Sequence, residues 1–549
     1  MTVEGSSGTQ VKGLAPKHIK LLTILLGILV QAPAFYLARS RSPFDTDELA
    51  LGLSVVHTWI GVPLLSLAWP ASLHVVLGQF YVVGTFATSH GGHSLSSLGH
   101  HLAGICADPY GLLSFMRYLT VILAAGAITV LARHLLKKGM PWWLVVAVSA
   151  ALAVQPNVMH HTMTAKGDGP GIWLAVIAMV MAVSEPKVKP VWIGTVLGLM
   201  FACRLSYFPI AAIVGIMAIV ARYGETKPLA VIKEAVPAFF IAFLLPTPFI
   251  WADPLRYMKN VLVHILETGP RFGMKTALIF QWHMMGPGMT VLILSLVAFA
   301  VLQRRWLTLV LSAALAGFFI MAVAKQSSYY DRYLLPTLLM IPMILIDLNY
   351  ENKSKLQLGW AAAVTAVCAV LVPQWVKADI DHVNSSVRDQ NTYKEAVAAA
   401  IAASANGKSL IPLNILTRGV GIEDNMSPQA AKRVENDALR AYATQTRIAY
   451  DKNDLLPLKD AVAERERGLI AQMRLVEYYT KGKADIQLWD PGDSGRFGCV
   501  TEDKAVALLQ KGQANAMLIP VEDISKFPGL KVSQTFRDLA LVTATKTLP

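Results

Sequence analysis

Charged residues are scarce in this sequence. Only 15% of its 549 residues are Asp, Glu, Lys or Arg, whereas soluble domains carry about 25%. Hydrophobic residues make up 54% of the chain and its mean hydropathy is +0.47, so most of it has to lie in a lipid bilayer. The scarcity of charge therefore excludes an ordinary soluble protein.

Cysteine and internal repetition are scarce too. The four cysteines form no Cys-x-x-Cys pair, which excludes a disulfide framework. No internal repeat or low-complexity tract is visible, which excludes a solenoid. The net charge of +13 is spread between apolar segments rather than clustered on one face. This distribution favours orientation in a membrane over nucleic-acid binding.

Apolar segments recur along most of the chain. The first, residues 19–38, is long enough to span a bilayer and lacks a clear cleavage site, so we interpret it as an uncleaved helix. The pattern predicts a mainly α, polytopic membrane protein with about eleven transmembrane helices, or up to about thirteen. The other ten segments are residues 111–132, 142–155, 169–183, 191–204, 207–221, 236–250, 289–302, 306–323, 333–346 and 360–375.

Lys and Arg residues fall in every second loop between these segments. The basic loops are residues 133–138, 187–189, 222–233, 304–305 and 353–355. Because cytoplasmic loops carry the excess of Lys and Arg, the N-terminus is predicted to be cytoplasmic, and the alternate loops and the C-terminus to lie outside. We predict a protein of the bacterial inner membrane with a periplasmic C-terminal part. An enzyme of the endoplasmic reticulum that faces the lumen fits the same pattern.

Hydropathy divides the chain into three parts. Residues 1–17 form a cytoplasmic tail, residues 18–376 the transmembrane domain, and residues 377–549 a soluble domain outside the membrane. The first outer loop, residues 39–110, is long. Within it, residues 62–83 are apolar but interrupted by proline and glycine, which predicts interfacial or re-entrant helices.

The soluble part is predicted to be a small α/β module. Helical stretches are expected at residues 393–405, 428–445 and 459–481, and strands at residues 409–415, 516–520 and 539–545.

Three carboxylates lie within four positions after the first apolar segment: Asp45, Asp47 and Glu48. Charges beside a membrane helix need water, a cation or a partner. Clustered carboxylates also suit proton abstraction or cation binding. A structural interpretation is open as well, in which Asp45 or Thr46 caps a helix that begins at Leu49. We interpret the cluster as catalytic, because every other chemically suggestive loop is predicted on the same side of the membrane.

Four further features lie in the outer loops. Lys166 and Asp168 open an apolar segment, where Asp168 is either a functional carboxylate or a helix N-cap. Arg204 lies at an outer turn, where it either snorkels or binds a lipid phosphate. The other two features are the Pro-containing segment end at residues 247–254 and the re-entering segment 325–336, with Lys325, Tyr329 and Arg332.

Taken in order, these motifs resemble the GT-C glycosyltransferase superfamily, in particular the branch of the protein mannosyltransferases and the lipid A aminoarabinose transferase. Those enzymes carry an acidic pair just after the first transmembrane helix, as in Asp47-Glu48. Their Arg-Tyr-Leu-x-Pro helix start is matched by residues 332–336. Asp168 matches an Asp that opens the fourth helix, and Arg204 a basic residue that follows a helix of small residues. The resemblance covers about residues 17–376.

The resemblance implies a glycosyltransferase of the EC 2.4 class that uses a polyprenyl-phosphate sugar as donor. Asp47, or Asp45, would take the proton from an acceptor hydroxyl as it attacks the anomeric carbon with inversion, and Glu48 belongs to the same catalytic cluster. Cations near the leaving phosphate would stabilise its charge. The candidate residues for binding the donor phosphate or sugar are Lys166, Asp168, Arg204, Lys325, Tyr329 and Arg332.

Asp45 and Glu48 also suit a divalent cation, Mg²⁺ or Mn²⁺, because hard cations prefer carboxylate oxygens. Metal dependence varies within the superfamily, so this role stays open beside the catalytic one; no other cofactor is expected. The acceptor is a glycan, a glycolipid or a protein, and the sequence does not identify the sugar.

Two other functions fit parts of the pattern. A transporter or lipid flippase also has many spans and intramembrane charge, but it usually has its polar groups near the bilayer midplane and in paired repeats. A structural subunit with a decayed active site is the third possibility. The intact acidic cluster and the Arg-Tyr-Leu-Leu-Pro motif favour the transferase over both.

Overall fold

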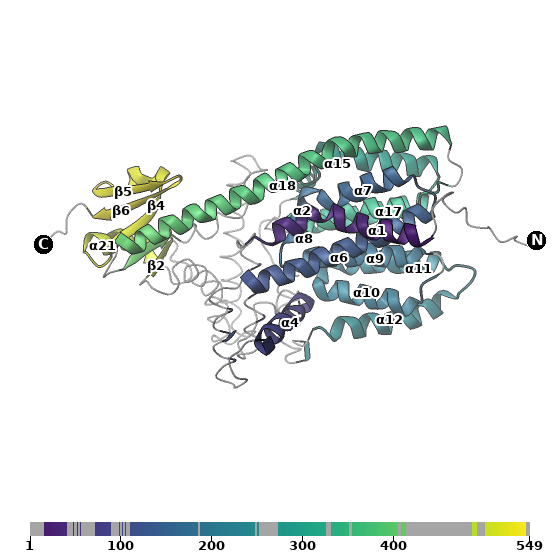
Figure 1. The fold of residues 1–549 in the computed structure, drawn as a ribbon, viewed down its shortest axis with the longest axis horizontal. Coiled ribbons are helices and arrows are strands. Elements are labelled where there is room, and N and C mark those ends of the chain that lie inside the picture. The colour runs from purple at the N-terminus through teal and green to yellow at the C-terminus, as the bar shows by residue number, and fades with distance from the viewer. Residues whose placement is uncertain are drawn as a thin grey trace, which may run out of the picture.

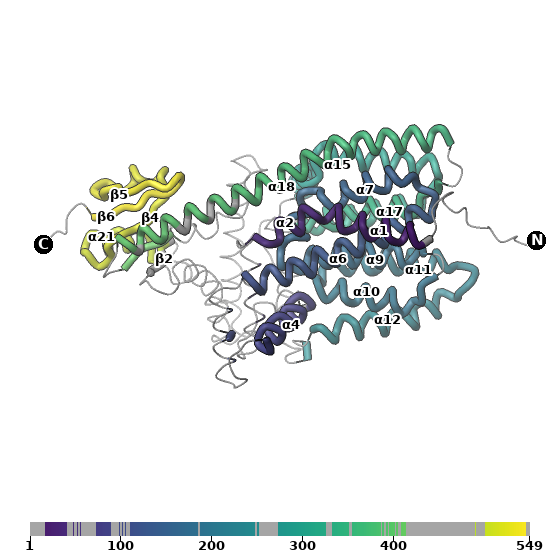
Figure 2. The backbone as a smooth tube through the Cα atoms, viewed as in Figure 1, coloured from purple at the N-terminus to yellow at the C-terminus, as the bar shows by residue number. Residues whose placement is uncertain are grey.

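The computed structural model consists of a helical bundle and a small sheet, which one long helix joins (Figure 1). The tube in Figure 2 shows this helix, α18 (Lys355–Ala403), running from the bundle to the sheet. At 1.5 Å per residue, its 49 residues extend over about 73 Å. The structure describes residues 16–40, 48, 52, 55, 72–88, 98, 101–102, 105, 110–184, 187–247, 250–251, 273–325, 331–350, 354–403, 408–412, 486–490 and 500–544.

Helices at each of the predicted apolar segments confirm the mainly α architecture. The bundle contains α1 (Pro16–Val30), α2 (Ala32–Ala38), α4 (Ser72–Thr88), α6 (Tyr110–Lys137), α7 (Trp142–Val154), α8 (Pro156–Met163), α9 (Asp168–Val183), α10 (Pro190–Cys203), α11 (Phe208–Val220), α12 (Pro228–Leu244), α15 (Gly273–Leu302), α16 (Trp306–Ala324) and α17 (Met340–Asp347). Short 3-10 helices are η2 (Leu205–Tyr207), η3 (Asp331–Tyr333) and η4 (Leu335–Leu339).

Several of these helices are long and apolar enough to cross a membrane, which makes the chain an integral membrane protein. Among the described residues, α6, α15, α16 and residues 355–385 of α18 satisfy this test. Two bent pairs also satisfy it: α1 with α2 at 44°, and α7 with α8 at 63°. The remaining apolar helices, among them α9, α10 and α17, are shorter. The structure thus has four to six candidate spans by this measure, fewer than the predicted eleven, because helices of 10–17 residues do not qualify.

Small residues allow a close contact between α10 and α12. Gly194 and Gly198 lie four positions apart on α10 and face α12. A Cβ at Gly194 would collide with the carbonyl oxygen of Ala235, and one at Gly198 with that of Phe239. This is the Gly-x-x-x-Gly arrangement that lets two membrane helices approach backbone to backbone.

The predicted basic loops meet at one end of the bundle. Buried Arg222 donates to the carbonyls of Ala182 and Val188 at 2.8 and 2.6 Å, and so joins two of these loops. The amide of Gln303 donates to the carbonyl of Asn349 at 3.0 Å and joins two more. Exposed aromatic residues begin helices at this end, as at a membrane interface; they are Trp142, Trp192 and Trp306, which are 70%, 58% and 58% exposed.

The C-terminal part is a six-stranded mixed sheet, which confirms the predicted α/β module. Its order is β3-β2-β1-β4-β6-β5. Strands β1 to β4 pair in parallel, and β6 is antiparallel to both of its neighbours, β4 and β5. Prediction located β1 (Ser409–Pro412), β4 (Ala516–Pro520) and β6 (Leu539–Ala544) and missed β2 (Ile486–Asp490), β3 (Val500–Thr501) and β5 (Leu530–Phe536). Helix α21 (Glu502–Gln510) follows β3.

The proposed domain boundary between residues 376 and 377 lies within α18. One continuous helix therefore carries the chain from the bundle to the sheet, where its final turns contain the predicted helix at 393–405. The helices predicted at 428–445 and 459–481 lie outside the described residues, as does most of the apolar stretch before α4. The three-part division of the chain stays a prediction.

Candidate active site

Glu48 is fully buried and forms an ion pair with Arg117 of α6. Arg117 Nε lies 2.6 Å from Glu48 Oε1, and Nη2 lies 2.6 Å from Oε2. This is the bidentate geometry that guanidinium and carboxylate groups favour. Glu48 Oε1 also accepts a hydrogen bond of 2.6 Å from the backbone N–H of Ala165. Glu48 thus joins the first outer loop to α6 and to the turn before α9.

Arg117 also binds the backbone just before the acidic cluster. Its Nη1 donates to the carbonyl of Ser40 at 2.7 Å and to that of Ala38 at 3.5 Å. Asp45 and Asp47 lie between these carbonyls and Glu48 but outside the described residues, so their roles stay predictions. Sequence reasoning missed Arg117, although an arginine inside an apolar helix is a signal of function.

Asp168 opens α9 but does not cap it. Gly167 holds the N-cap position and Asp168 is the first helical residue, so the N-cap interpretation is wrong. Its carboxylate instead forms an ion pair with Arg204. Tyr207 supports the same corner, because its hydroxyl donates to the Asp168 carbonyl at 3.3 Å. Lys166, two residues earlier, is 2% exposed, so the turn directs both charged side chains into the protein.

Arg204 follows α10 in an extended conformation and contacts three structural elements. Besides the Asp168 carboxylate, it donates from Nε to the Ser206 hydroxyl at 2.9 Å. Its guanidinium carbon lies 5.0 Å from the ring centroid of Tyr333, a cation–π contact. The guanidinium carbon of Arg332 lies 5.6 Å from the same ring, and Arg332 is 3% exposed. Tyr333 therefore lies between two arginines that the sequence places 128 positions apart.

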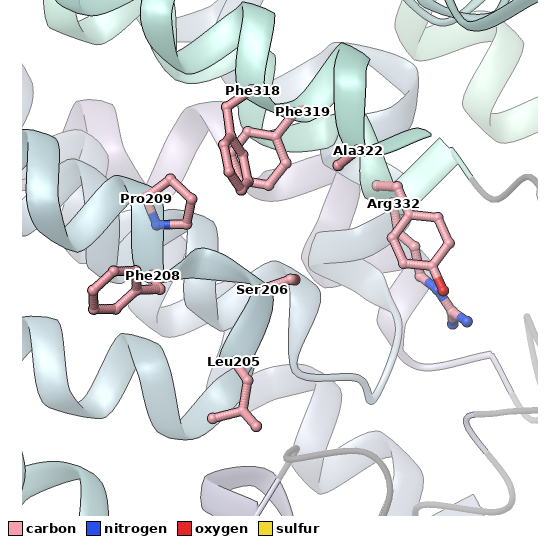
Figure 3. Close-up of a pocket in the computed structure, with 9 residues that line it drawn as sticks. Leu205, Ser206, Phe208, Pro209, Phe318, Phe319, Ala322 and Arg332 are labelled. Atoms are coloured by element: carbon pink, nitrogen blue, oxygen red, sulfur yellow. The ribbon is translucent and has the colours of Figure 1, made fainter. Parts of the chain in front are cut away.

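An apolar groove of about 270 Å³ ends beside these arginines (Figure 3). Figure 3 shows Phe318 and Phe319 of α16 facing Pro209 of α11 across the groove. Arg332 lies at one end of the groove, away from Pro209. Phe208 and Phe318 are 60% and 45% exposed, so the walls of the groove continue to the outer surface of the bundle. The lining is completed by Leu205, Ser206, Ala322 and Tyr333.

A chain of contacts connects five of the predicted site residues at one end of the bundle. Glu48 binds the turn that carries Lys166 and Asp168, Asp168 pairs with Arg204, and Arg204 shares the Tyr333 ring with Arg332. Lys325 is exposed and follows α16, one turn beyond Ala322 in the groove. Tyr329 lies outside the described residues.

The predicted divalent cation finds no ligand set in the described part of the chain. No group of three or more His, Cys, Asp or Glu side chains there could hold a metal ion. Both oxygens of Glu48 already accept hydrogen bonds from Arg117 or Ala165. Asp45, the other predicted ligand, lies outside the described residues, so the cation site at Asp45 and Glu48 stays a prediction.

No protein-family model matches the sequence, and no curated protein matches it. The chain is similar to two solved structures of ArnT from Cupriavidus metallidurans. The structure bound to undecaprenyl phosphate is 9% identical at a TM-score of 0.45, over 96% of this chain and 98% of that one. The apo structure is 10% identical at 0.45, over 94% and 97%.

Proposed function

We propose that this protein transfers a sugar from a polyprenyl-phosphate donor to an acceptor hydroxyl at the end of the bundle that carries Arg204 and Arg332. One observation carries the proposal: an apolar groove that opens on the bundle surface ends at a buried arginine. A lipid phosphate has the same two halves, an apolar tail and an anionic head.

The groove suits the isoprenoid tail of the donor. Its walls are phenylalanine, proline, leucine and alanine side chains, which a hydrocarbon chain contacts without losing hydrogen bonds. Because bilayer lipid is as apolar as the groove, shape and van der Waals contact select the tail rather than the hydrophobic effect.

The arginines suit the phosphate. A guanidinium group binds phosphate with two parallel hydrogen bonds, and these are stronger in a water-poor site. Arg332 lines one end of the groove, and Arg204 contacts two other lining residues, Ser206 and Tyr333. The Asp168 carboxylate neutralises Arg204 when no phosphate is bound. Donor binding would then shift Arg204 from the carboxylate towards the phosphate.

The reaction follows from these roles. Asp47 or Asp45 accepts the proton of the acceptor hydroxyl as its oxygen forms a bond to the anomeric carbon. The bond between that carbon and the phosphate oxygen breaks on the opposite side. The configuration at the anomeric carbon is therefore inverted, and polyprenyl phosphate leaves with one more negative charge. Arg332, Arg204 and Lys166 stabilise that charge. We assign Glu48 to holding this region, because its oxygens are engaged by Arg117 and Ala165.

We further propose that the protein lies in a bacterial inner membrane with the site and the C-terminal sheet on the periplasmic side. The gathering of basic loops at the opposite end of the bundle supports this orientation. The sheet lies beyond the site end along α18, which suits a domain that binds the acceptor glycan, glycolipid or protein (Figure 1).

A lipid flippase is the second candidate function. The helix break at Gly286, where φ is 68° inside α15, favours it, because transporters use broken helices near the membrane centre. The groove and its arginines suit a flipped lipid phosphate as well as a donor.

The test compares surface glycolipids and glycoproteins by mass spectrometry in four strains at matched protein levels: wild type, deletion, Asp45→Asn and Asp47→Asn. A transferase predicts that the deletion and at least one substitution lose the same sugar mass. If the deletion changes a glycan but both Asn variants behave as wild type, the carboxylates are not the base and the flippase is favoured.

A further inference from the structure

We infer that Arg117 is a positioning residue that, through Glu48, fixes the acidic segment 41–47 and the turn 164–168 relative to each other. The inference rests on the proposed function, because it assigns the pair to the same transfer reaction. Neither residue needs to touch the substrate for this role.

Arg117 holds the chain on both sides of the acidic segment. On the N-terminal side, its Nη1 donates to Ser40 at 2.7 Å. On the C-terminal side, Nε and Nη2 bind the two oxygens of Glu48. One guanidinium group therefore binds the two described residues, Ser40 and Glu48, that come before and after Asp45 and Asp47 in the sequence.

Glu48, the acidic partner of Arg117, also binds the turn that carries the proposed phosphate-binding residues. Glu48 Oε1 accepts from the N–H of Ala165, which directly precedes Lys166. Asp168, the ion-pair partner of Arg204, follows three residues after Ala165. The proposed base and the proposed phosphate-binding residues thus share one rigid connection, which runs through Arg117 and Glu48.

Lysine could not replace Arg117 in this arrangement. The guanidinium group distributes five donors in a fixed plane, and here it serves carbonyls and both carboxylate oxygens at once. An ammonium group is a point charge with donors close together. Both partners are fully buried, so neither charge can be satisfied by water if the other is removed.

The experiment measures the donor KM and kcat of purified protein with a polyprenyl-phosphate sugar for wild type, Arg117→Lys, Arg117→Met and Glu48→Gln. Hydrogen exchange of the Ala165 amide is measured on the same samples. Because a misplacement of about 1 Å can cost about 100-fold in rate, we expect kcat of Arg117→Met to fall about 100-fold. The donor KM should rise by a smaller factor than kcat falls, because the turn 164–168 loses its anchor while Arg332 and the groove are untouched. Ala165 should exchange at least about tenfold faster, since its acceptor is released.

Arg222→Met is the matched control. Arg222 is also a buried arginine that donates to several backbone carbonyls, but it lies at the other end of the bundle. Its loss should reduce the yield of folded protein while leaving kcat per folded molecule and the exchange of Ala165 as in wild type. The double variant Arg117→Met/Glu48→Gln should be no slower than the worse single variant, because the two side chains act as one unit.

Two results would overturn the inference: an unchanged kcat in folded Arg117→Met, or full rescue of kcat by lysine with Ala165 still exchanging fast. A failure of the proposed function looks different. Wild type would then transfer no sugar at all, which removes the catalytic role of the pair. The hydrogen exchange of Ala165 and of residues 36–48 would still report whether Arg117 anchors the two segments.

Discussion

Replacing Arg332 by methionine tests the phosphate site most directly. Arg332 is 3% exposed, lies on η3 and lines the end of the apolar groove. Methionine keeps the apolar stem and removes only the charge and the donors. The variant therefore separates recognition of the phosphate from packing of the groove.

The expected loss follows from one charge-assisted contact. A hydrogen bond to a charged group contributes about 1.5–3 kcal/mol. With about 1.36 kcal/mol per factor of ten in rate, kcat/KM for the donor should fall about 10- to 150-fold. Part of the loss should appear in kcat, since the phosphate gains charge as it leaves. Arg332→Lys should lose less, because it keeps the charge but not the planar fork.

The assay titrates a polyprenyl-phosphate sugar against purified protein in lipid nanodiscs and follows the transferred sugar by mass spectrometry. Arg305→Met is the control, because Arg305 lies 3.7 Å from Asp347 at the basic end of the bundle and is 34% exposed. The reasoning is refuted if Arg332→Met and Arg305→Met have the same kcat/KM within about twofold, the limit of resolution for a contact of this size.

Three further predictions concern the groove, the ion pair beside it and the break in α15. Ala322→Trp fills the groove and should raise the donor KM with the melting temperature unchanged, because that face is open; an unchanged KM means that the tail lies elsewhere. Asp168→Asn leaves Arg204 without its carboxylate partner. The free energy of unfolding should fall by about 3 kcal/mol, as measured by thermal unfolding; this is the low end for a buried pair, because Arg204 is 16% exposed. Gly286 has φ 68° and ψ 168°, a region that is essentially restricted to glycine, and no atom lies within 4 Å of a Cβ built there. Gly286→Ala should therefore lower the free energy of unfolding through backbone strain alone, by about 1–3 kcal/mol in thermal unfolding.

Hydrophobicity was sufficient to predict the bundle and the buried strands. The apolar runs coincide with helices because a bilayer leaves the backbone no other way to satisfy its polar groups. In the sheet, β4 and β6 are apolar and buried, and both were predicted. Strand β5 was missed because Lys531, Ser533 and Gln534 make it polar: it is an edge strand, exposed along most of its length.

The site residues were easier to predict than their pairing. Asp168 and Arg204 were both candidates, but nothing local in the sequence shows that residues 36 positions apart form an ion pair. Arg117 lies 69 positions from Glu48 and between apolar neighbours, so its role depends on tertiary structure alone. Conversely, the break of the helix at Pro156 is readable, because proline forces the residue before it out of the helical region; Gln155 has ψ 128°.

Two of the helix breaks in the bundle lie side by side and support the turn at 164–168 that reaches Glu48. The Met284 carbonyl lies two residues before the break at Gly286 and accepts hydrogen bonds from outside its own helix. The side chains of Gln155 and Asn157, at the bend between α7 and α8, donate to it at 3.2 and 2.8 Å. Gln155 Oε1 meanwhile caps α8 by accepting from the N–H of Val158 at 2.8 Å. Side chains at the bend between α7 and α8 thus bind the backbone of α15 next to its own break.

The resulting 63° bend turns α8 away from the direction of α7. A straight continuation would extend the chain further along the axis of α7, away from the position where Ala165 can donate to Glu48 at 2.6 Å. The Gln-Pro-Asn and Gly-Pro-Gly sequences that interrupt two apolar helices are therefore part of the site, although neither contributes a charged side chain to it. The break in α15 that favours a transporter also has this second explanation, in which it is a fixed support for the transferase site.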